Sequence, residues 1–251
     1  MTARRLTGPI LFFTILTVAG CFSSGPSVAD DLSRGNAKRD SGDVEGALSV
    51  YNAVLENDPK NTRALMNRGL AEVQADRREA ALADYNQAIS LDPDYALAYY
   101  NRGDAKNGQG DFEGAMADYT KAIALPLASS GAMYVDYSRF RLALTLRRLH
   151  RDDTPAGLAA AVAKEPEGWT KNVGRFLTGQ LTEAGLLAAA AAGDEKTAPL
   201  RQCEAYYYAG FARLLQGDRA GAYDLFGKCL GTGVKYFKEY DLARAELARQ
   251  Q

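Results

Sequence analysis

Between residues 31 and 128 the same pattern of small, apolar and polar positions occurs three times, with a spacing of 34 residues. Each copy contains two helix-forming stretches separated by a short polar turn. Because one helical hairpin cannot bury its own apolar face, the pattern predicts an all-α fold in which successive hairpins stack. The residues that repeat in register are Gly35, Gly69 and Gly103, Ala47, Ala81 and Ala115, Tyr51, Tyr85 and Tyr119, and Asp58-Pro59 with Asp92-Pro93.

This period resembles the tetratricopeptide repeat (TPR), a helix–turn–helix unit that stacks into a solenoid. With Val28, Thr62 and Ala96 as first positions, small residues fall at positions 8 and 20, an aromatic at 24 and proline at 32. Only Pro126 in the third copy departs, one residue early. The resemblance implies three TPR repeats over residues 31–128, with Asp30 or Asp31 capping the first helix.

After residue 128 the period weakens, but helical patterns continue to the end of the chain. Residues 129–202 read as degenerate helical repeats, with helices expected at 132–149, 154–164, 169–177 and 182–193. Residues 203–251 read as a C-terminal TPR-like repeat, because Gly210, Ala222 and Phe226 take positions 8, 20 and 24 when Cys203 is position 1. An amphipathic helix over Tyr236–Arg249 is expected to cap the open end of the solenoid.

The N-terminus carries the pattern of a targeting segment, with Arg4 and Arg5 before an apolar stretch. Val18-Ala19-Gly20-Cys21 resembles the lipobox of bacterial lipoproteins. The resemblance implies a signal peptide over residues 1–20, lipidation of Cys21 by acyl chains such as palmitate, and a flexible tether over 21–30. Two or three acyl chains anchor a protein stably to a membrane. The alternative is an ordinary secretory signal with an incidental cysteine.

Further motifs, taken with the lipobox and the repeats, resemble the NlpI-type TPR lipoproteins of Gram-negative bacteria. The motifs are Trp169, Phe176–Gly179, Glu204–Gly210, Gly217-Asp218 and Phe237–Tyr240. The resemblance implies a homodimeric scaffold without enzymatic activity on the periplasmic face of the outer membrane, and Phe22 after Cys21 fits outer-membrane sorting. It implies partners among peptidoglycan hydrolases, presented to a processing protease or gathered into wall-synthesis complexes. The alternative is a structural assembly factor for outer-membrane protein insertion or for a secretion or pilus system.

Composition and the absence of known motifs argue against nucleic-acid binding, metal or cofactor binding, and catalysis. The 251 residues carry a formal net charge of −1, whereas nucleic-acid binding needs a concentrated basic face, so no nucleic acid is expected. Three cysteines and the single His150 have no metal-ligand spacing, so neither a metal nor another cofactor is expected. The chain carries no phosphate-binding loop, nucleophile elbow or zinc-protease motif, so we expect no enzyme.

The concave face of a TPR array is lined by the first helix of each repeat. Its side chains here suit an extended or helical segment of another protein. The alternative is that the chain's own C-terminal helices, or a dimer mate, cover them. The candidate groove residues are Leu32, Asn36, Arg39, Arg63, Met66, Asn67, Leu70, Val73, Leu97, Tyr100, Asn101, Asp104 and Asn107.

Two further features have alternative interpretations. Arg34, Arg68 and Arg102 share the repeat period with Asp84 and Asp118, which favours an Arg–Asp ladder between helices over a basic stripe for an acidic partner.

Cys203 and Cys229 fall where two antiparallel helices of one repeat approach each other. A disulfide between them would suit an oxidising periplasm. Two buried free thiols are the interpretation we favour, because free cysteine is commonly buried. A reactive thiol is the third alternative.

Overall fold

The computed structural model describes residues 27–125, 132–151 and 157–250, and helices are the only regular secondary structure within these ranges. The predicted all-α class is therefore confirmed. In chain order the helices are α1 (Val28–Asp40), α2 (Val44–Asn57), α3 (Thr62–Gln74), α4 (Arg78–Leu91), α5 (Ala96–Gln109), α6 (Phe112–Ala124), α7 (Ala132–Arg148), α8 (Leu158–Lys164), α9 (Trp169–Leu177), α10 (Glu183–Ala191), α11 (Ala198–Leu215), α12 (Arg219–Gly231) and α13 (Lys238–Ala248).

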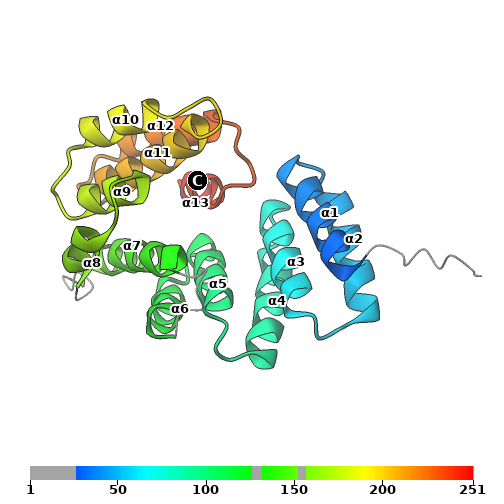
Figure 1. The fold of residues 1–251 in the computed structure, drawn as a ribbon. Coiled ribbons are helices and arrows are strands. Elements are labelled where there is room, and N and C mark those ends of the chain that lie inside the picture. Colours follow the sequence, from blue (N-terminus) through cyan, green and yellow to red (C-terminus); the bar gives the residue numbers. More distant parts are fainter. Residues whose placement is uncertain (1–26, 126–131, 152–156, 251) are drawn as a thin grey trace, which may run out of the picture.

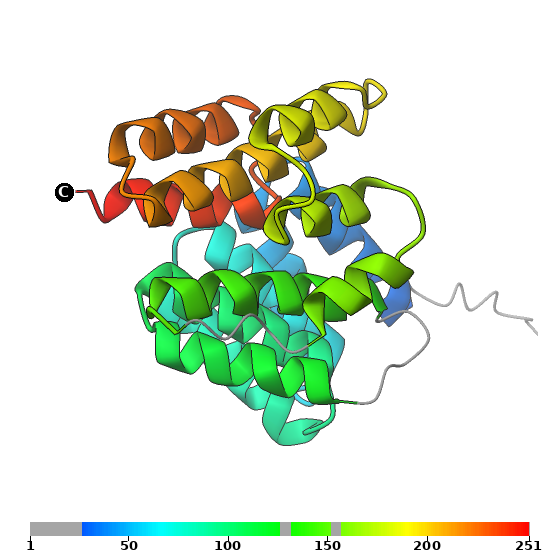
Figure 2. The same ribbon diagram turned by 90° about the vertical axis from the view of Figure 1, so that its left-hand side faces the viewer.

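The helices stack into a curved array that bends round on itself (Figure 1). The pairs α1–α2, α3–α4 and α5–α6 form one arm, α7 to α9 form the bend, and α10 to α12 form the other arm. Figure 1 shows α13 end-on inside the curve, and α13 contacts α5, α11 and α12. Seen from the side, α13 runs alongside α11 and α12 (Figure 2). The last helix thus lies on the concave side of the array.

The repeated glycine and tyrosine contact each other in every repeat. A Cβ atom added to Gly35, Gly69 or Gly103 would lie 2.5, 2.5 and 2.7 Å from a ring carbon of Tyr51, Tyr85 and Tyr119, respectively. All three tyrosines are fully buried. The glycine is therefore required because the ring of the second helix packs directly on the backbone of the first. This contact explains the period seen in the sequence.

The same relationship recurs near the C-terminus, between Gly210 of α11 and Phe226 of α12, where an added Cβ would lie 2.9 Å from the ring. The predicted TPR-like repeat therefore forms, although α11 begins at Ala198, before Cys203. The ring of Phe226 also packs near that of Tyr207, with centroids 6.1 Å apart.

The turns between paired helices use one left-handed residue at the same point of each repeat. Gly42, Asp76 and Gly110 have φ values of +90°, +63° and +91°. Glycine adopts this conformation freely, whereas aspartate does so at a cost. Asp43 and Asp111 then cap the following helices by accepting hydrogen bonds from Gly46 and Gly114.

The first helix begins earlier than predicted. α1 starts at Val28 because Ser27 and Asp30 form a capping box, in which each side chain accepts a hydrogen bond from the other residue's backbone N–H. α8 begins at Leu158, after Gly157 at φ +89°. The start predicted for that helix at Thr154 lies outside the described residues, as do the signal peptide and Cys21.

The Arg–Asp ladder forms in two of the three repeats. Arg68 donates two hydrogen bonds to Asp84, at 2.9 and 2.6 Å, and Arg102 donates two to Asp118, at 2.8 and 2.6 Å. Each arginine also reaches back to an asparagine of the preceding repeat. In the first repeat Val50 stands where the aspartate would be, and Arg34 pairs with Asp31 on its own helix. The ladder therefore ties neighbouring repeats together.

Candidate functional site

The C-terminal helix occupies part of the predicted groove. Nζ of Lys238 lies 3.9 Å from the ring centroid of Tyr100 and 3.3 Å from Oδ2 of Asp104, and it also donates to Oδ1 of Asn101. Farther along α13, Nη2 of Arg244 donates to the carbonyl oxygen of Val73 at 3.2 Å. The sequence left open whether the groove is free for a partner or is covered. In the structure the C-terminal helix covers part of it.

A fully buried arginine, Arg141, fixes the position of α13 against the repeats. Arg141 of α7 pairs with Glu239 of α13, and its Nε lies 3.3 Å from Oδ1 of Asp104 on α5. Its Nη1 donates to the hydroxyl of Tyr208 on α11 at 3.1 Å. The guanidinium also lies 5.0 Å from the ring centroid of Tyr207. One cation thus joins four helices.

A second ion pair fixes the far end of α13. Arg148 donates two hydrogen bonds to the carboxylate of Glu246, at 2.6 and 2.7 Å, which is the strong bidentate geometry. The guanidinium of Arg148 also lies 4.7 and 4.6 Å from the ring centroids of Phe112 and Phe211. Since both ends of α13 are held by charged hydrogen bonds, the helix is an integral part of the fold.

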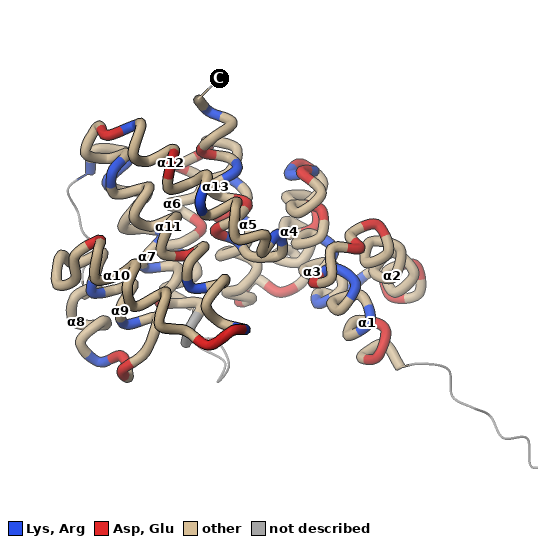
Figure 3. Tube along the Cα trace, turned by 90° about the horizontal axis from the view of Figure 1, so that it is seen from above, with Lys and Arg blue, Asp and Glu red and all other residues tan. Residues whose placement is uncertain are grey.

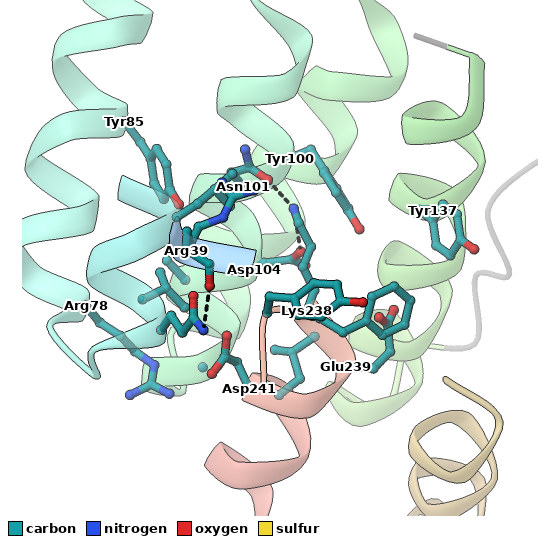
Figure 4. Close-up of a pocket in the computed structure, with 18 of the residues that line it drawn as sticks. Arg39, Arg78, Tyr85, Tyr100, Asn101, Asp104, Tyr137, Lys238, Glu239 and Asp241 are labelled. Atoms are coloured by element: carbon teal, nitrogen blue, oxygen red, sulfur yellow. Dashed lines mark hydrogen bonds and ion pairs between the residues drawn. The ribbon is translucent and has the colours of Figure 1, made fainter. Parts of the chain in front are cut away.

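A cavity of about 300 Å³ remains between α13 and the repeats (Figure 4). Eleven of its 19 lining residues are apolar or aromatic, and the other eight carry polar or charged groups. Apolar walls with polar groups that fix orientation are typical of binding pockets. The lining residues are Arg39, Leu70, Val73, Gln74, Arg78, Tyr85, Tyr100, Asn101, Asp104, Ala105, Gly108, Tyr134, Tyr137, Tyr236, Phe237, Lys238, Glu239, Asp241 and Leu242.

Charges of both signs surround this cavity. Arg39, Arg78 and Lys238 face it together with the carboxyl groups of Asp104, Glu239 and Asp241. Burial raises the pKa of Asp241 to about 7 and lowers the pKa of Lys238. Among the residues that the structure describes, basic and acidic positions are interspersed along the trace (Figure 3). The cavity therefore favours neither a strongly cationic nor a strongly anionic ligand.

The predicted groove residues divide into three groups. Those that line the cavity are Arg39, Leu70, Val73, Tyr100, Asn101 and Asp104. Those that pack in the helical core are Leu32, Met66 and Leu97. The others lie elsewhere: Asn36 accepts a hydrogen bond from Tyr51, Asn107 is buried, Asn67 is half-buried and Arg63 is exposed. Their role in binding stays a prediction.

Sequence reasoning did not include the part of the wall that lies outside the first helices of the repeats. Tyr85 comes from the second helix of its repeat, Tyr134 and Tyr137 from α7, and Tyr236 to Leu242 from the C-terminal segment. The Phe237–Tyr240 motif was visible in the sequence, but nothing local placed it beside the repeats.

The two C-terminal cysteines lie side by side in the core. Cys203 and Cys229 are both free and fully buried, and Sγ of Cys229 lies 3.6 Å from the carbonyl oxygen of Glu239. Burial and the neighbouring Cys203 thiol raise the pKa of Cys229. In this structure the pair forms part of the packing.

The three described ranges contain neither a cluster of metal-binding side chains nor a helix that could span a membrane. No group of three or more His, Cys, Asp and Glu side chains there is arranged to hold a metal ion. None of the helices described is both long and apolar enough to cross a bilayer.

Comparison with known proteins agrees with the repeat pattern. A family model described as tetratricopeptide repeat matches residues 32–96 and 68–131. No curated protein matches the sequence of the chain. The repeats predicted from the 34-residue period are therefore TPR units.

Solved structures share the fold at low sequence identity. One is a tetratricopeptide repeat protein from Parabacteroides merdae ATCC 43184, 21% identical, with 84% of this chain and 80% of that chain covered and a TM-score of 0.55. Another is PilW, described as a widely conserved type IV pilus biogenesis factor, 18% identical, with 80% and 90% covered and a TM-score of 0.53. Likeness at this level concerns the arrangement of helices.

Proposed function

We propose that this protein, a TPR protein over residues 32–131, acts by holding other proteins in its concave groove. TPR arrays commonly mediate contacts between proteins, and their fold is typically non-catalytic. The observation that carries the proposal is the cavity of about 300 Å³, bounded by repeats on one side and by α13 on the other. Its apolar and aromatic wall, together with its polar and charged groups, suits a segment of polypeptide.

The proposed setting is the periplasmic face of the outer membrane, with the protein anchored through acyl chains on Cys21. The lipobox at residues 18–21 and the resemblance to NlpI-type lipoproteins support this location. We propose that the partners are peptidoglycan hydrolases, which the scaffold presents to a processing protease or gathers into wall-synthesis complexes, and that the scaffold is a homodimer. Anchoring raises the effective concentration of bound partners, so that two weak contacts act as one strong one.

A second candidate function belongs to the same class of anchored TPR proteins. The structural likeness to PilW, a pilus biogenesis factor, favours a role in assembling a pilus, a secretion system or outer-membrane proteins. Both candidates need an anchor and a groove, so only the identity of the partners separates them.

The test is affinity capture from a crosslinked and solubilised bacterial envelope, using the full-length lipidated protein. Recovery of peptidoglycan endopeptidases with a protease supports the hydrolase scaffold. Recovery of pilus, secretin or barrel-insertion components instead would replace it with the assembly role. Release of muropeptides by the purified protein from peptidoglycan would overturn the scaffold function.

A further inference from the structure

The three repeats treat the same tyrosine hydroxyl in different ways. In the first repeat the hydroxyl of Tyr51 donates to Oδ1 of Asn36 at 2.7 Å, and in the third that of Tyr119 donates to Oδ1 of Asp104 at 2.8 Å. The equivalent position in the second repeat is Leu70. The hydroxyl of Tyr85 therefore has no hydrogen-bond partner, although its side chain is fully buried.

Other unpaired polar atoms belong to residues of the same cavity wall. Nδ2 of Asn101 has no acceptor, and the amide orientation is fixed because Oδ1 accepts from Lys238. Nη1 of Arg39 is unpaired, since Asp40 takes its Nε and Nη2, at 3.1 and 2.9 Å. Figure 4 shows the side chains of Tyr85, Arg39 and Asn101, which all line this cavity.

Two unpaired acceptors accompany these donors, Oε1 of Gln74 and Oδ2 of Asp104, and Oδ2 has only the ion contact with Lys238 at 3.3 Å. Nε2 of Gln74 donates to the carbonyl oxygen of Arg39 at 3.5 Å, which leaves Oε1 of Gln74 buried without a donor. Buried polar groups are nearly always hydrogen-bonded, and an unpaired one destabilises the folded state. Several unpaired polar groups around one cavity therefore point to an occupant that would form hydrogen bonds with them.

The mixture of donors and acceptors limits what that occupant is. An anion would leave Oε1 of Gln74 unpaired and would lie near the carboxyl groups of Asp104 and Asp241. A cation would leave the three donors unpaired and would meet Arg39 and Lys238. A neutral amide has one carbonyl acceptor and one N–H donor, so it matches both sets.

The shape of the site favours an extended segment. α13 already lies on the concave face over α5, where a bound helix would lie. The remaining space is flanked by the apolar side chains of Leu70, Val73 and Leu242 and by the rings of Tyr100 and Tyr236, of which Tyr236 is 45% exposed at the surface.

We propose that this cavity binds an extended segment of a partner protein through the amide groups of its backbone, with one apolar or aromatic side chain against the rings. The proposal rests on the scaffold function proposed above and specifies its recognition site. Tyr85, Asn101 and Arg39 donate to carbonyl oxygens of the segment, and Gln74 accepts from an N–H group. Leu70 leaves the Tyr85 hydroxyl free for this contact.

Two variants and one matched control test the assignment. Tyr85→Phe removes an unpaired hydroxyl, so the folded protein should be at least as stable as wild type while binding weakens about tenfold. Leu70→Asn places at that position the amide that Asn36 provides in the first repeat, so it should engage Tyr85 and abolish binding. Tyr51→Phe loses a hydrogen bond outside the cavity and should leave binding unchanged.

The probe is a phage-displayed library of random linear peptides, selected on the full chain. Selected peptides are then synthesised and measured by calorimetry against wild type and variants, and each peptide bond is N-methylated in turn. We expect loss of affinity when particular N–H groups are removed and when Tyr85 is changed. Selection of no binder, equal binding by Tyr85→Phe, or tolerance of N-methylation at every bond would overturn the proposal.

The same variants separate this proposal from the scaffold function. If envelope capture by Leu70→Asn and Tyr85→Phe equals that by wild type, the scaffold function stands and the cavity is not its recognition site. If wild type captures no envelope protein while the selected peptides bind as expected, the recognition site stands and the proposed setting fails.

Discussion

The guanidinium of Arg141 on α7 and the carboxylate of Glu239 on α13 form an ion pair that solvent does not reach. The two side chains are 0% and 3% exposed, although the residues lie 98 positions apart in the chain. Because this contact draws the last helix into the concave side of the repeats, it also creates the wall of the cavity. The pair therefore connects the stability of the fold with the shape of the candidate site.

Removing one partner of this pair should destabilise the protein strongly. Glu239→Gln leaves the buried Arg141 without its main counter-charge, and breaking a buried ion pair in this way typically costs about 3 to 5 kcal/mol. We expect a loss of that order in the free energy of unfolding, measured by urea denaturation of the full chain.

The matched control is Glu183→Gln. Glu183 also forms a two-bond ion pair between helices, with Arg213, but the two side chains are 29% and 38% exposed. Exposed pairs contribute little, so the expected loss is below about 1 kcal/mol. Equal effects of the two substitutions would contradict the structural role given to Arg141.

The repeat glycine should tolerate no side chain. In Gly69→Ala the new Cβ would lie 2.5 Å from a ring carbon of Tyr85, so the two helices must separate. Overpacking of this kind typically costs about 1 to 3 kcal/mol. Gly227→Ala on α12 is the control, since no heavy atom lies within 4 Å of the new Cβ, and it should gain up to about 1 kcal/mol from helix propensity. Thermal unfolding of both variants provides the comparison, and a Gly69→Ala protein as stable as wild type would refute the packing argument.

Stability should fall as the pH rises toward 8. Burial, with the nearby Glu239, raises the pKa of Glu204 to about 8, and Nε1 of Trp169 donates to the carboxyl group at 2.6 Å. An unfolded glutamate titrates near about 4.3, so between these values the folded state holds one more proton than the unfolded state. The free energy of unfolding therefore decreases with pH in this window, by at most about 1.4 kcal/mol per pH unit from this group.

The measurement is urea unfolding at a series of pH values for wild type and Glu204→Gln. The amide does not titrate and still accepts the hydrogen bond from Trp169, so the variant should show a flatter dependence above about pH 4. Below about pH 4 both the folded and the unfolded state of wild type hold the proton, so Glu204 no longer contributes to the pH dependence of the free energy of unfolding. Parallel curves for the two proteins would show that Glu204 is ionised in the folded state.

The buried cysteines should be unreactive in the native protein. Cys203 and Cys229 are both fully buried, and burial raises the pKa of Cys229, so little reactive thiolate is present. Iodoacetamide should modify neither residue until the chain is unfolded, as mass spectrometry of the peptides would show. A mass lower by two hydrogen atoms for the linked peptides, without reductant, would instead reveal the disulfide.

The lipid anchor can be tested without reference to the fold. Cys21→Ser should abolish incorporation of labelled palmitate and release the protein from the membrane fraction, because the acyl chains are its proposed attachment. Cys203→Ser should keep both the label and the location, since its thiol is buried in the core. Labelling of the Cys21→Ser protein would place the lipid elsewhere or contradict the lipobox.

The unpaired hydroxyl of Tyr85 is related to a difference between the repeats that is present in the sequence but is not part of the TPR pattern. Position 9 of the three repeats is Asn36, Leu70 and Asp104, so the change of polarity in the second repeat was legible. The sequence did not show what this change does, because only the structure shows that the side chain at position 9 faces the tyrosine hydroxyl at position 24.

The sequence by itself determined the repeats, because their defining contacts are local. Gly69 and Tyr85 are 16 positions apart and meet within one hairpin, so the same residues must return with every hairpin, and the period becomes visible. The tertiary structure alone decided where α13 lies. Its place depends on single contacts such as that of Arg141 with Glu239, between residues far apart in the chain, and an unrepeated contact of that kind leaves no periodic trace.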